Sequence, residues 1–132
     1  MLFRSSAICY EVVYPSLARS AVSAGSELLT TITNDAWFGR TSAPHQHFSQ
    51  AAMRAIEQGR YLVRAANTGI SGVVDPYGRV LAQAELFENA RVVADVRWIN
   101  AKTVYGWTGD LFVYLCLMLV LCVLVIGVRA SR

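Results

Sequence analysis

The stretch "LFRSSAICYEVVYPSLARSAVSAGSELLTTIT", residues 2–33, decides the fold that is predicted for this chain. Residues 2–10 end in apolar side chains and are predicted to form a strand. Pro15 suits the first turn of a helix, and Gly25 is placed to end that helix. Residues 27–33 are rich in β-branched side chains, which favour a second strand. The order strand, helix, strand is typical of an α/β layered sheet.

The pattern continues with a second helix and further strands. Apolar side chains recur at helical spacing within residues 45–64, which predicts a helix there. The turn signature "PYG" at residues 76–78 separates two predicted strands, "SGVVD" and "RVLAQAE". The segment "ARVVADVRW", residues 90–98, has the composition of one more strand. We therefore expect residues 1–104 to form one α/β domain.

An uncharged apolar segment follows this domain. It is "LFVYLCLMLVLCVLVIGV", residues 111–128, in a chain of 132 residues that is 55% hydrophobic with a mean hydropathy of +0.38. A helix of this length is roughly 27 Å long, close to the roughly 30 Å hydrocarbon core of a bilayer. Tyr105 and Trp107, in a predicted interfacial linker at residues 105–110, suit the membrane surface. The sequence predicts one transmembrane helix and a short tail, residues 129–132.

The charges around this helix bear on its orientation and on partners. Arg129 and Arg132 favour a cytoplasmic C-terminus. Three basic residues on the other side weaken that preference: Arg91, Arg97 and Lys102. Residues 1–110 hold ten basic and nine acidic residues, so this part is nearly neutral. A neutral surface does not fit nucleic acid, and no nucleic-acid partner is expected.

Metal, disulfide and cofactor sites are not expected either. His45 and His47 are the only histidines, and a spacing of two makes their side chains diverge on a helix. The three cysteines have no spacing typical of a metal site or a disulfide. Two of them, Cys116 and Cys122, lie in the apolar run, where packing is the expected role.

The third cysteine, Cys9, has two interpretations. It closes an apolar strand, so it can be a small buried hydrophobe. It also lies where a strand meets a helix N-terminus, whose N–H groups and dipole favour a thiolate. In that case the N–H of Tyr10 can point at a developing oxyanion, and Glu11 can orient a neighbour or a substrate group. The spacing of residues assigns no partner base.

The loop "TNDAWFG", residues 33–39, follows the second predicted strand, where α/β folds carry binding residues. It places Asn34 and Asp35 beside the aromatic residues Trp37 and Phe38. The alternative is an Asx turn whose aromatic side chains pack on the core. The Asn-Thr-Gly turn within "RAANTGISGVVDPYGRV" is likewise ordinary turn chemistry when taken alone.

Taken together, these segments resemble one family. "ICYE", "TNDAWFG", "PHQHF", "MRAIEQGRYLVRAANTGISGVVDPYGRV" and a C-terminal membrane helix occur in the order and at the approximate spacing seen in apolipoprotein N-acyltransferases, membrane-bound members of the nitrilase superfamily. The resemblance covers nearly the whole chain. It implies a partial nitrilase-type α-β-β-α sandwich, the C-terminal part of a carbon-nitrogen hydrolase domain, followed by one transmembrane helix.

The resemblance also implies a reaction. Such enzymes take an acyl chain from a membrane phospholipid as a cysteine thioester and transfer it to the N-terminal amine of a diacylglyceryl lipoprotein. By this similarity Cys9 is the nucleophile, Tyr10 the backbone oxyanion donor and Glu11 a supporting residue. Three residues of the following loop are the expected substrate-binding residues: Asn34, Trp37 and Phe38. The implied location is the bacterial inner (plasma) membrane, with the catalytic part periplasmic and the C-terminus cytoplasmic.

The chain departs from the family upstream of the cysteine. Nitrilase-type enzymes use a glutamate base and a lysine that precede the cysteine, whereas only eight residues precede Cys9 here. Lys102, the sole lysine, comes too late to match. We therefore expect the carboxyl-terminal part of such an enzyme, inactive alone, with an uncovered sheet face and edge and a separately encoded N-terminal half as a possible partner. A membrane-tethered nitrilase-type amidase and a catalytically inactive membrane-anchored fragment remain as alternatives.

Overall fold

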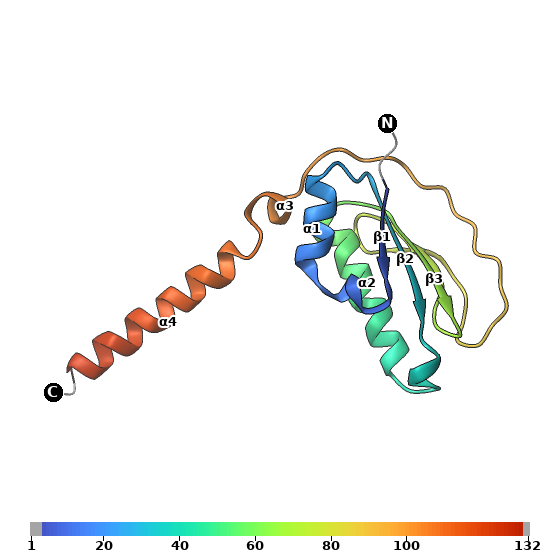
Figure 1. Ribbon diagram of the computed structural model, residues 1–132. Helices are drawn as coiled ribbons and strands as arrows, with labels where there is room; N and C mark the ends of the chain where they lie inside the picture. Colours follow the sequence, from blue (N-terminus) through green and yellow to red (C-terminus); the bar gives the residue numbers. More distant parts are fainter. Residues whose placement is uncertain (1–3, 131–132) are drawn as a thin grey trace.

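The computed structural model describes residues 4–130 and contains one mixed five-stranded sheet (Figure 1). The strands lie side by side in chain order: β1 (Arg4–Ile8), β2 (Leu28–Asn34), β3 (Leu62–Asn67), β4 (Gly72–Val74) and β5 (Val80–Gln83). The first three strands are parallel, and β4 and β5 are antiparallel to their neighbours. This arrangement confirms the α/β sheet expected from the sequence.

The register of the parallel strands brings their carboxyl ends to one edge of the sheet. Ile8 of β1 pairs with Ile32 of β2, and Asn34 of β2 pairs with Asn67 of β3. Cys9 follows β1 directly, so it lies at the same edge as the loops after β2 and β3. The segments singled out in the sequence are thereby brought together.

Two helices cover one face of this sheet: α1 (Pro15–Ser23) and α2 (Ala43–Gln58) (Figure 1). Pro15 stands at the start of α1, as its fixed φ predicts. Short 3₁₀ turns, η1 (Cys9–Val13) and η2 (Ala36–Phe38), follow β1 and β2. The core lies between helices and sheet and is formed by Val12, Val22, Leu29, Phe48, Ala51, Ala55, Leu62, Ile70 and Val74.

The opposite face of the sheet is open in the described part of the chain. Ile8 is 60% exposed and Ile32 is 54% exposed, although both are apolar strand residues. Ser6 and Thr30 share a side-chain hydrogen bond of 2.7 Å on the same face. Within residues 4–130, β1 pairs with β2 alone, so its other edge is free. The expectation of an uncovered sheet face and edge is confirmed for these residues.

The second helix is shorter than predicted. The sequence favoured a helix over residues 45–64, whereas α2 ends at Gln58 and β3 begins at Leu62. Gly59 adopts a left-handed conformation with φ of +60°, and Arg60 N donates to Ala55 O at 3.0 Å, which ends the helix. The prediction was wrong because the helical spacing was extended through a glycine stop into a buried strand.

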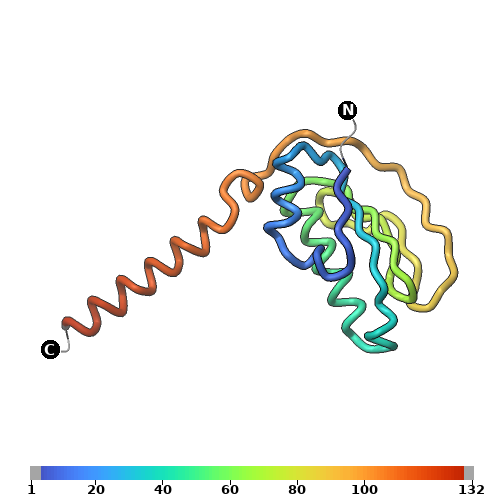
Figure 2. Tube along the Cα trace, viewed as in Figure 1, coloured from blue at the N-terminus to red at the C-terminus, as the bar shows by residue number. Residues whose placement is uncertain are grey.

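The strand predicted at residues 90–98 is also wrong. Residues 84–103, here called the strap, contain no helix or strand and run around the sheet in an extended path (Figure 2). Partly buried and exposed residues alternate along much of the strap, with Val92 half-buried and Val93 78% exposed. The alternation that suggested a strand is therefore real, but in the described residues the strap pairs with no neighbouring strand.

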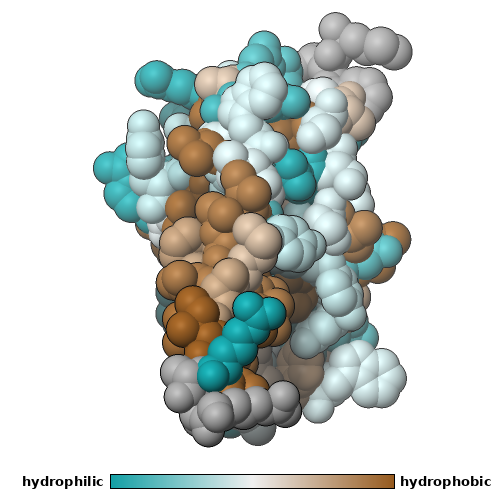
Figure 3. All heavy atoms as spheres, turned by 90° about the vertical axis from the view of Figure 1, so that its left-hand side faces the viewer, coloured by the Kyte–Doolittle hydropathy of each residue, from teal (hydrophilic) through white to brown (hydrophobic). Residues whose placement is uncertain are grey.

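The strap leads into a short helix, α3 (Val104–Thr108), and a long one, α4 (Leu111–Ala130). Residues 111–129 have a mean hydropathy of 3.1 and none of that window is buried, and mainly apolar residues are visible on the side of α4 that Figure 3 shows. This helix is long and apolar enough to cross a membrane. Arg19 of α1 binds the preceding short helix α3, because the Arg19 guanidinium donates to Gly106 O at 3.3 Å and to Trp107 O at 3.0 Å.

Arg60 fastens the strap to the domain. Its guanidinium, 2% exposed, donates to Ser26 O at 3.0 Å and to Ala101 O at 2.6 Å, and also reaches the carbonyls of Gln58 and Gly59. Burial lowers the pKa of Arg60, and Glu27 opposes that shift. One side chain thus joins the start of β2, the end of α2 and the strap.

Replacing Arg60 tests this role. Arg60→Gln removes most of these charge-assisted bonds, so we expect a loss of about 3 kcal/mol in the free energy of unfolding and faster proteolysis within the strap. Thermal unfolding and timed protease digestion in mild detergent measure both effects. Arg91→Gln, an exposed strap residue, is the matched control and should leave both unchanged. Equal protease resistance in the two variants would contradict the anchoring role.

Candidate active site

Cys9 occupies a strained turn between β1 and η1. Its φ is +52°, and the other described non-glycine residues with positive φ are Thr68 and Phe87. Such a conformation costs of order 1–3 kcal/mol and is concentrated at functional sites. A sharp turn between a strand and a helix presents its side chain at the edge of the sheet. The thiol is half-buried, so Cys9 is not the fully buried hydrophobe of the alternative interpretation.

Glu11 supports this turn by bonding its backbone. The Glu11 carboxylate accepts a hydrogen bond from Ile8 N at 2.7 Å, across the residue that carries the thiol. The backbone of η1 then closes with Tyr14 N donating to Glu11 O at 3.1 Å. Glu11 therefore holds the conformation of the Cys9 turn, and no bond between its carboxylate and another side chain occurs among the described residues.

A second clamp joins the end of η1 to helix α2. Arg54 donates from Nη1 to Val13 O at 2.7 Å and from Nη2 to Glu57 Oε1 at 2.6 Å. Burial raises the pKa of the Glu57 carboxyl group, while Arg54 opposes that shift. The Cys9 turn is thus fixed from inside by Glu11 and from the helix layer by Arg54.

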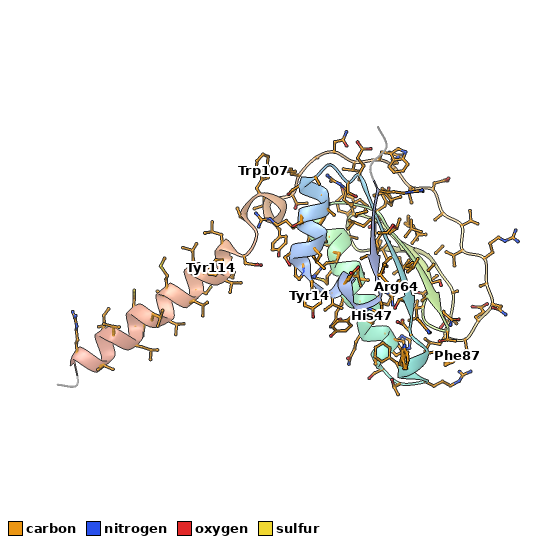
Figure 4. All side chains as sticks on the ribbon, viewed as in Figure 1. Tyr14, His47, Arg64, Phe87, Trp107 and Tyr114 are labelled. Atoms are coloured by element: carbon orange, nitrogen blue, oxygen red, sulfur yellow. The ribbon has the colours of Figure 1, made fainter. Side chains whose placement is uncertain are left out.

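A buried charged cluster lies at the same edge of the sheet, and the sequence did not reveal it. Arg64 Nη2 donates to Asp35 Oδ2 at 2.7 Å, and the side chains of both residues are completely buried. His47 Nδ1 lies 3.0 Å from Asp35 Oδ1 and 3.1 Å from Arg64 Nη2 (Figure 4). Thr33 Oγ1 also donates to Asp35 Oδ1 at 2.9 Å. Side chains from three elements, β2, β3 and α2, therefore all contact the Asp35 carboxylate.

The contacts of His47 place its Nδ1 between an acceptor and a donor. With a proton on Nδ1 it donates to Asp35 Oδ1, and without one it accepts from Arg64 Nη2, so one nitrogen makes one of the two hydrogen bonds at a time. Nε2 of His47 is buried with no hydrogen-bond partner among the described residues. The rings of Tyr10 and Phe38 lie 5.9 Å and 6.1 Å from the imidazole, centroid to centroid. His47 therefore links the charged cluster to the residue after Cys9.

The Asn-Thr-Gly turn closes over Asp35. A Cβ atom at Gly69 would lie 2.3 Å from Asp35 Oδ2, so no side chain fits at that position. Asp35 N donates to Asn67 O at 3.2 Å, which joins the loops after β2 and β3. The turn that is ordinary by its sequence alone therefore covers the buried Asp35 carboxylate.

The predicted substrate-binding residues lie in the neighbouring loop, with different exposures. Asn34 Oδ1 accepts from Ala36 N at 3.2 Å and from Asn67 Nδ2 at 3.3 Å, as in the Asx-turn alternative. Trp37 is 85% exposed and does not pack on the core, whereas Phe38 is half-buried against His47. Their role in substrate binding, and that of the Tyr10 N–H as an oxyanion donor, stay predictions.

Two further features limit what the site can hold. A cavity of about 200 Å³ lies beside β1 and α1, and its lining includes Ala7, Glu11 and Arg54 but not Cys9. Among residues 4–130, no group of three or more His, Cys, Asp or Glu side chains is placed to hold a metal ion. The chemistry available at this edge of the sheet is that of a thiol beside buried charges.

The charged cluster left one signal in the sequence. Arg64 interrupts the apolar strand segment "LVRAAN", and a charge in the middle of a buried strand needs a partner. The partner itself could not be deduced, because Asp35 and His47 lie 29 and 17 residues away along the chain. Spacing rules for helices and strands do not reach across such distances.

Comparisons with known proteins agree with this geometry. Residues 4–103 match the carbon-nitrogen hydrolase family. The chain is 46% identical over 109 residues to an apolipoprotein N-acyltransferase of Geobacter metallireducens, covering 83% of this chain and 21% of that protein. It is 42% identical over 113 residues to the corresponding protein of Pseudomonas syringae pv. tomato, covering 85% and 22%. The chain thus spans about a fifth of the length of these relatives.

Solved structures show the same fold. An amidase from Nesterenkonia sp. AN1, with the acetamide moiety of fluoroacetamide covalently added at its active site cysteine, has a TM-score of 0.51 and 28% identity, over 63% of this chain and 34% of that one. A carbon-nitrogen hydrolase from Helicobacter pylori G27 has a TM-score of 0.55 at 20% identity, over 62% and 36%. The resemblance to apolipoprotein N-acyltransferases is confirmed, and with a family match over residues 4–103 this chain belongs to the carbon-nitrogen hydrolase family.

Proposed function

We propose that this chain carries the nucleophile of a membrane acyltransferase that moves an acyl chain from phospholipid, through a thioester on Cys9, to the N-terminal amine of a lipoprotein. The observation that carries the proposal is the turn at Cys9, with φ of +52°, at the carboxyl edge of the parallel strands. Cys9 is also the sole cysteine within the family-matched residues 4–103. The similarity to the Geobacter and Pseudomonas proteins supports the acyl-transfer chemistry.

The reaction is a two-step exchange at one sulfur atom. The Cys9 thiolate attacks the carbonyl carbon of the phospholipid ester, the C–S bond forms, and the glycerol oxygen leaves with a proton. The lipoprotein amine then attacks the thioester, an amide forms, and the thiol returns. The Tyr10 N–H is the proposed donor to the oxyanion in both steps. Asn34, Trp37 and Phe38 are the proposed contacts of the substrates.

A base and an oxyanion-stabilising cation are assigned to other parts of the enzyme. Glu11 already bonds Ile8 N at 2.7 Å, and Lys102 lies in the strap, where its ammonium group is 5.0 Å from the Trp107 ring. Neither is therefore proposed as the base or the lysine of the reaction. We propose that a separate segment or a separately encoded half supplies both, and that residues 4–130 alone transfer acyl groups at background rate.

An amidase is the second candidate, favoured by one observation. The Nesterenkonia amidase shares 28% identity and the fold, and covalent addition occurs at its active site cysteine. Cys9 would then form its thioester from an amide, with the amine as the leaving group, and water would release the acid and the thiol. The apolar helix α4 argues for the acyltransferase, since a phospholipid donor and a lipidated acceptor both reside in a membrane.

A chimera tests the proposed nucleophile. The full chain replaces the matching region of the Geobacter metallireducens relative, and the purified protein is incubated with phospholipid. We expect a hydroxylamine-sensitive acyl adduct on the peptide that contains Cys9, detected by mass spectrometry. Cys9→Ser should abolish the adduct and reduce transfer by about 10³-fold or more, because a hydroxyl is a much poorer nucleophile than a thiol at the same position.

The chain contains a matched control for this experiment. Cys116 and Cys122 lie in α4, and replacing both with serine should leave the adduct and transfer unchanged. An adduct on either of them, or full transfer by Cys9→Ser, would remove the chemical basis of the proposal. Formation of free fatty acid without transfer to an amine acceptor would favour the amidase-type reaction.

The Glu11 clamp gives a graded prediction in the same chimera. Glu11→Ala removes the acceptor of Ile8 N, so we expect transfer to fall about tenfold, equivalent to about 1.4 kcal/mol of lost positioning. Glu11→Gln keeps an acceptor oxygen at the same place and should retain most of the rate. Initial rates with saturating phospholipid measure both. Equal rates for the alanine variant and the parent would exclude a supporting role for Glu11.

The proposed orientation is testable by labelling single cysteines. In a background without native cysteines, Val93→Cys reports on the strap and Arg129→Cys on the end of α4. If α4 spans the inner membrane with a cytoplasmic C-terminus, a membrane-impermeant maleimide labels position 93 in intact spheroplasts and position 129 only after lysis. Labelling of both positions before lysis would exclude a spanning helix, and the reverse pattern would exclude the proposed orientation.

A further inference from the structure

The charged cluster of Asp35, His47 and Arg64 lies next to the Cys9 turn, because the ring of Tyr10 is 5.9 Å from the imidazole of His47. Ala7, Thr31 and Arg64 occupy one cross-strand row of the sheet. Cys9 follows Ala7 by two residues and comes directly after the first of these strands. The side chains of Ala7 and Thr31 are small, and the long Arg64 side chain of the same row reaches Asp35, which follows the carboxyl end of β2.

We propose that Arg64 is a positioning residue for Cys9, with its buried guanidinium held by Asp35 and His47 at the edge of the sheet so that its positive charge stabilises the Cys9 thiolate. This inference rests on the proposed function, since it gives the cluster a task at the same nucleophile. It adds a group that acts on the sulfur without bonding to substrate.

The hydrogen bonds of Arg64 fix the guanidinium and leave part of it unused. Nε donates to Ile70 O at 3.2 Å, and Nη2 donates to Asp35 Oδ2 at 2.7 Å. Nη1 is buried and has no hydrogen-bond partner among the described residues. A wholly buried N–H group without a partner is costly in a merely structural ion pair. Nη1 is therefore the part of the guanidinium that stays available to an anion.

The place of Cys9 relative to this charge follows from the contact of Tyr10, the next residue, with His47, whose Nδ1 lies 3.1 Å from Arg64 Nη2. Burial lowers the pKa of the Arg64 guanidinium, and the opposing contributions come from Asp35 and from Cys9. The guanidinium remains charged, since its ordinary pKa is far above neutral. The interaction with the thiolate is little screened by salt, because the Arg64 side chain has no exposed surface.

The other charged groups near the Cys9 turn do not present a terminal guanidinium nitrogen without a partner. Glu11 places a carboxylate against Ile8 N, which is the wrong sign for a thiolate. Arg54 is paired with Glu57 at 2.6 Å and bonds Val13 O. Asp35 offsets part of the charge of Arg64, so the two have opposite effects on the potential at the sulfur. That opposition provides the test.

The experiment compares two alkylating agents that differ in charge. The full chain, in uncharged detergent at neutral pH and 0.15 M salt, is treated with iodoacetate, an anion, or iodoacetamide, which is neutral. Peptide mass spectrometry gives the rate of alkylation at Cys9. The rate with iodoacetate divided by the rate with iodoacetamide reports the local potential, because a positive charge near the sulfur attracts the anion only. In the native chain we expect this ratio to exceed the ratio for the urea-unfolded chain by roughly threefold or more. An equal ratio would overturn the proposal without any variant.

Variants then assign the potential to Arg64. Arg64→Gln should lower the ratio to that of the unfolded chain, and Arg64→Lys should restore part of it. Asp35→Asn should raise the ratio above that of the parent, although it breaks the same ion pair. Structural damage would move Arg64→Gln and Asp35→Asn in the same direction, and that result would contradict the proposal. Arg91→Gln is the control and should leave the ratio unchanged.

This readout is separate from the proposed reaction, because alkylation needs no acyl donor and no additional segment. A raised ratio that depends on Arg64, combined with an absence of acyl adduct in the chimera, would support the positioning role and reject acyl transfer. An acyl adduct on Cys9 with a ratio that does not depend on Arg64 would reject the positioning role alone.

Discussion

The ion pair between Asp35 and Arg64 is the constraint on which the carboxyl edge of the sheet depends. Both side chains have no exposed surface, and their nearest atoms are 2.7 Å apart. Removing one partner from such a pair costs about 3–5 kcal/mol, since the other charge stays buried alone. The loops after β2 and β3 must therefore close over the pair, which is why Gly69 leaves no room for a side chain there. The candidate site is built on this closed edge.

Buried arginines organise the rest of the domain in a similar way. Arg54 and Arg60 are 7% and 2% exposed, and each binds backbone carbonyl groups at the ends of elements. An arginine presents several donors in a rigid fork. One side chain can therefore join segments that are neither paired strands nor parts of one helix. The strap and the Cys9 turn are held in this manner. A formal charge of +3 from the whole composition consequently overstates the basic character of the surface.

The sequence predicted those features that depend on local chemistry. Pro15 marked the start of α1, the β-branched run marked β2, and "ICYE" and "TNDAWFG" located the Cys9 turn and its neighbouring loop. The prediction failed at Gly59, where the helical spacing continues although the chain leaves α2 and enters a strand. It also failed in the strap, where the alternation of a strand is present but no neighbouring strand pairs with it in the described residues. The pairing of Asp35 with His47 and Arg64 is a tertiary choice, and neither propensity nor spacing encodes it.

The position of Cys9 has a further consequence for how the site is completed. The strained turn follows β1, which is also the edge strand of the described sheet, so β2, Glu11 and Arg54 fix Cys9 from one side only. A free strand edge is a template for pairing with another segment. A parallel strand that paired with β1 would have its carboxyl end beside Cys9. Under the proposed function, this free edge is where a separate segment would bring the base and the cation to the sulfur.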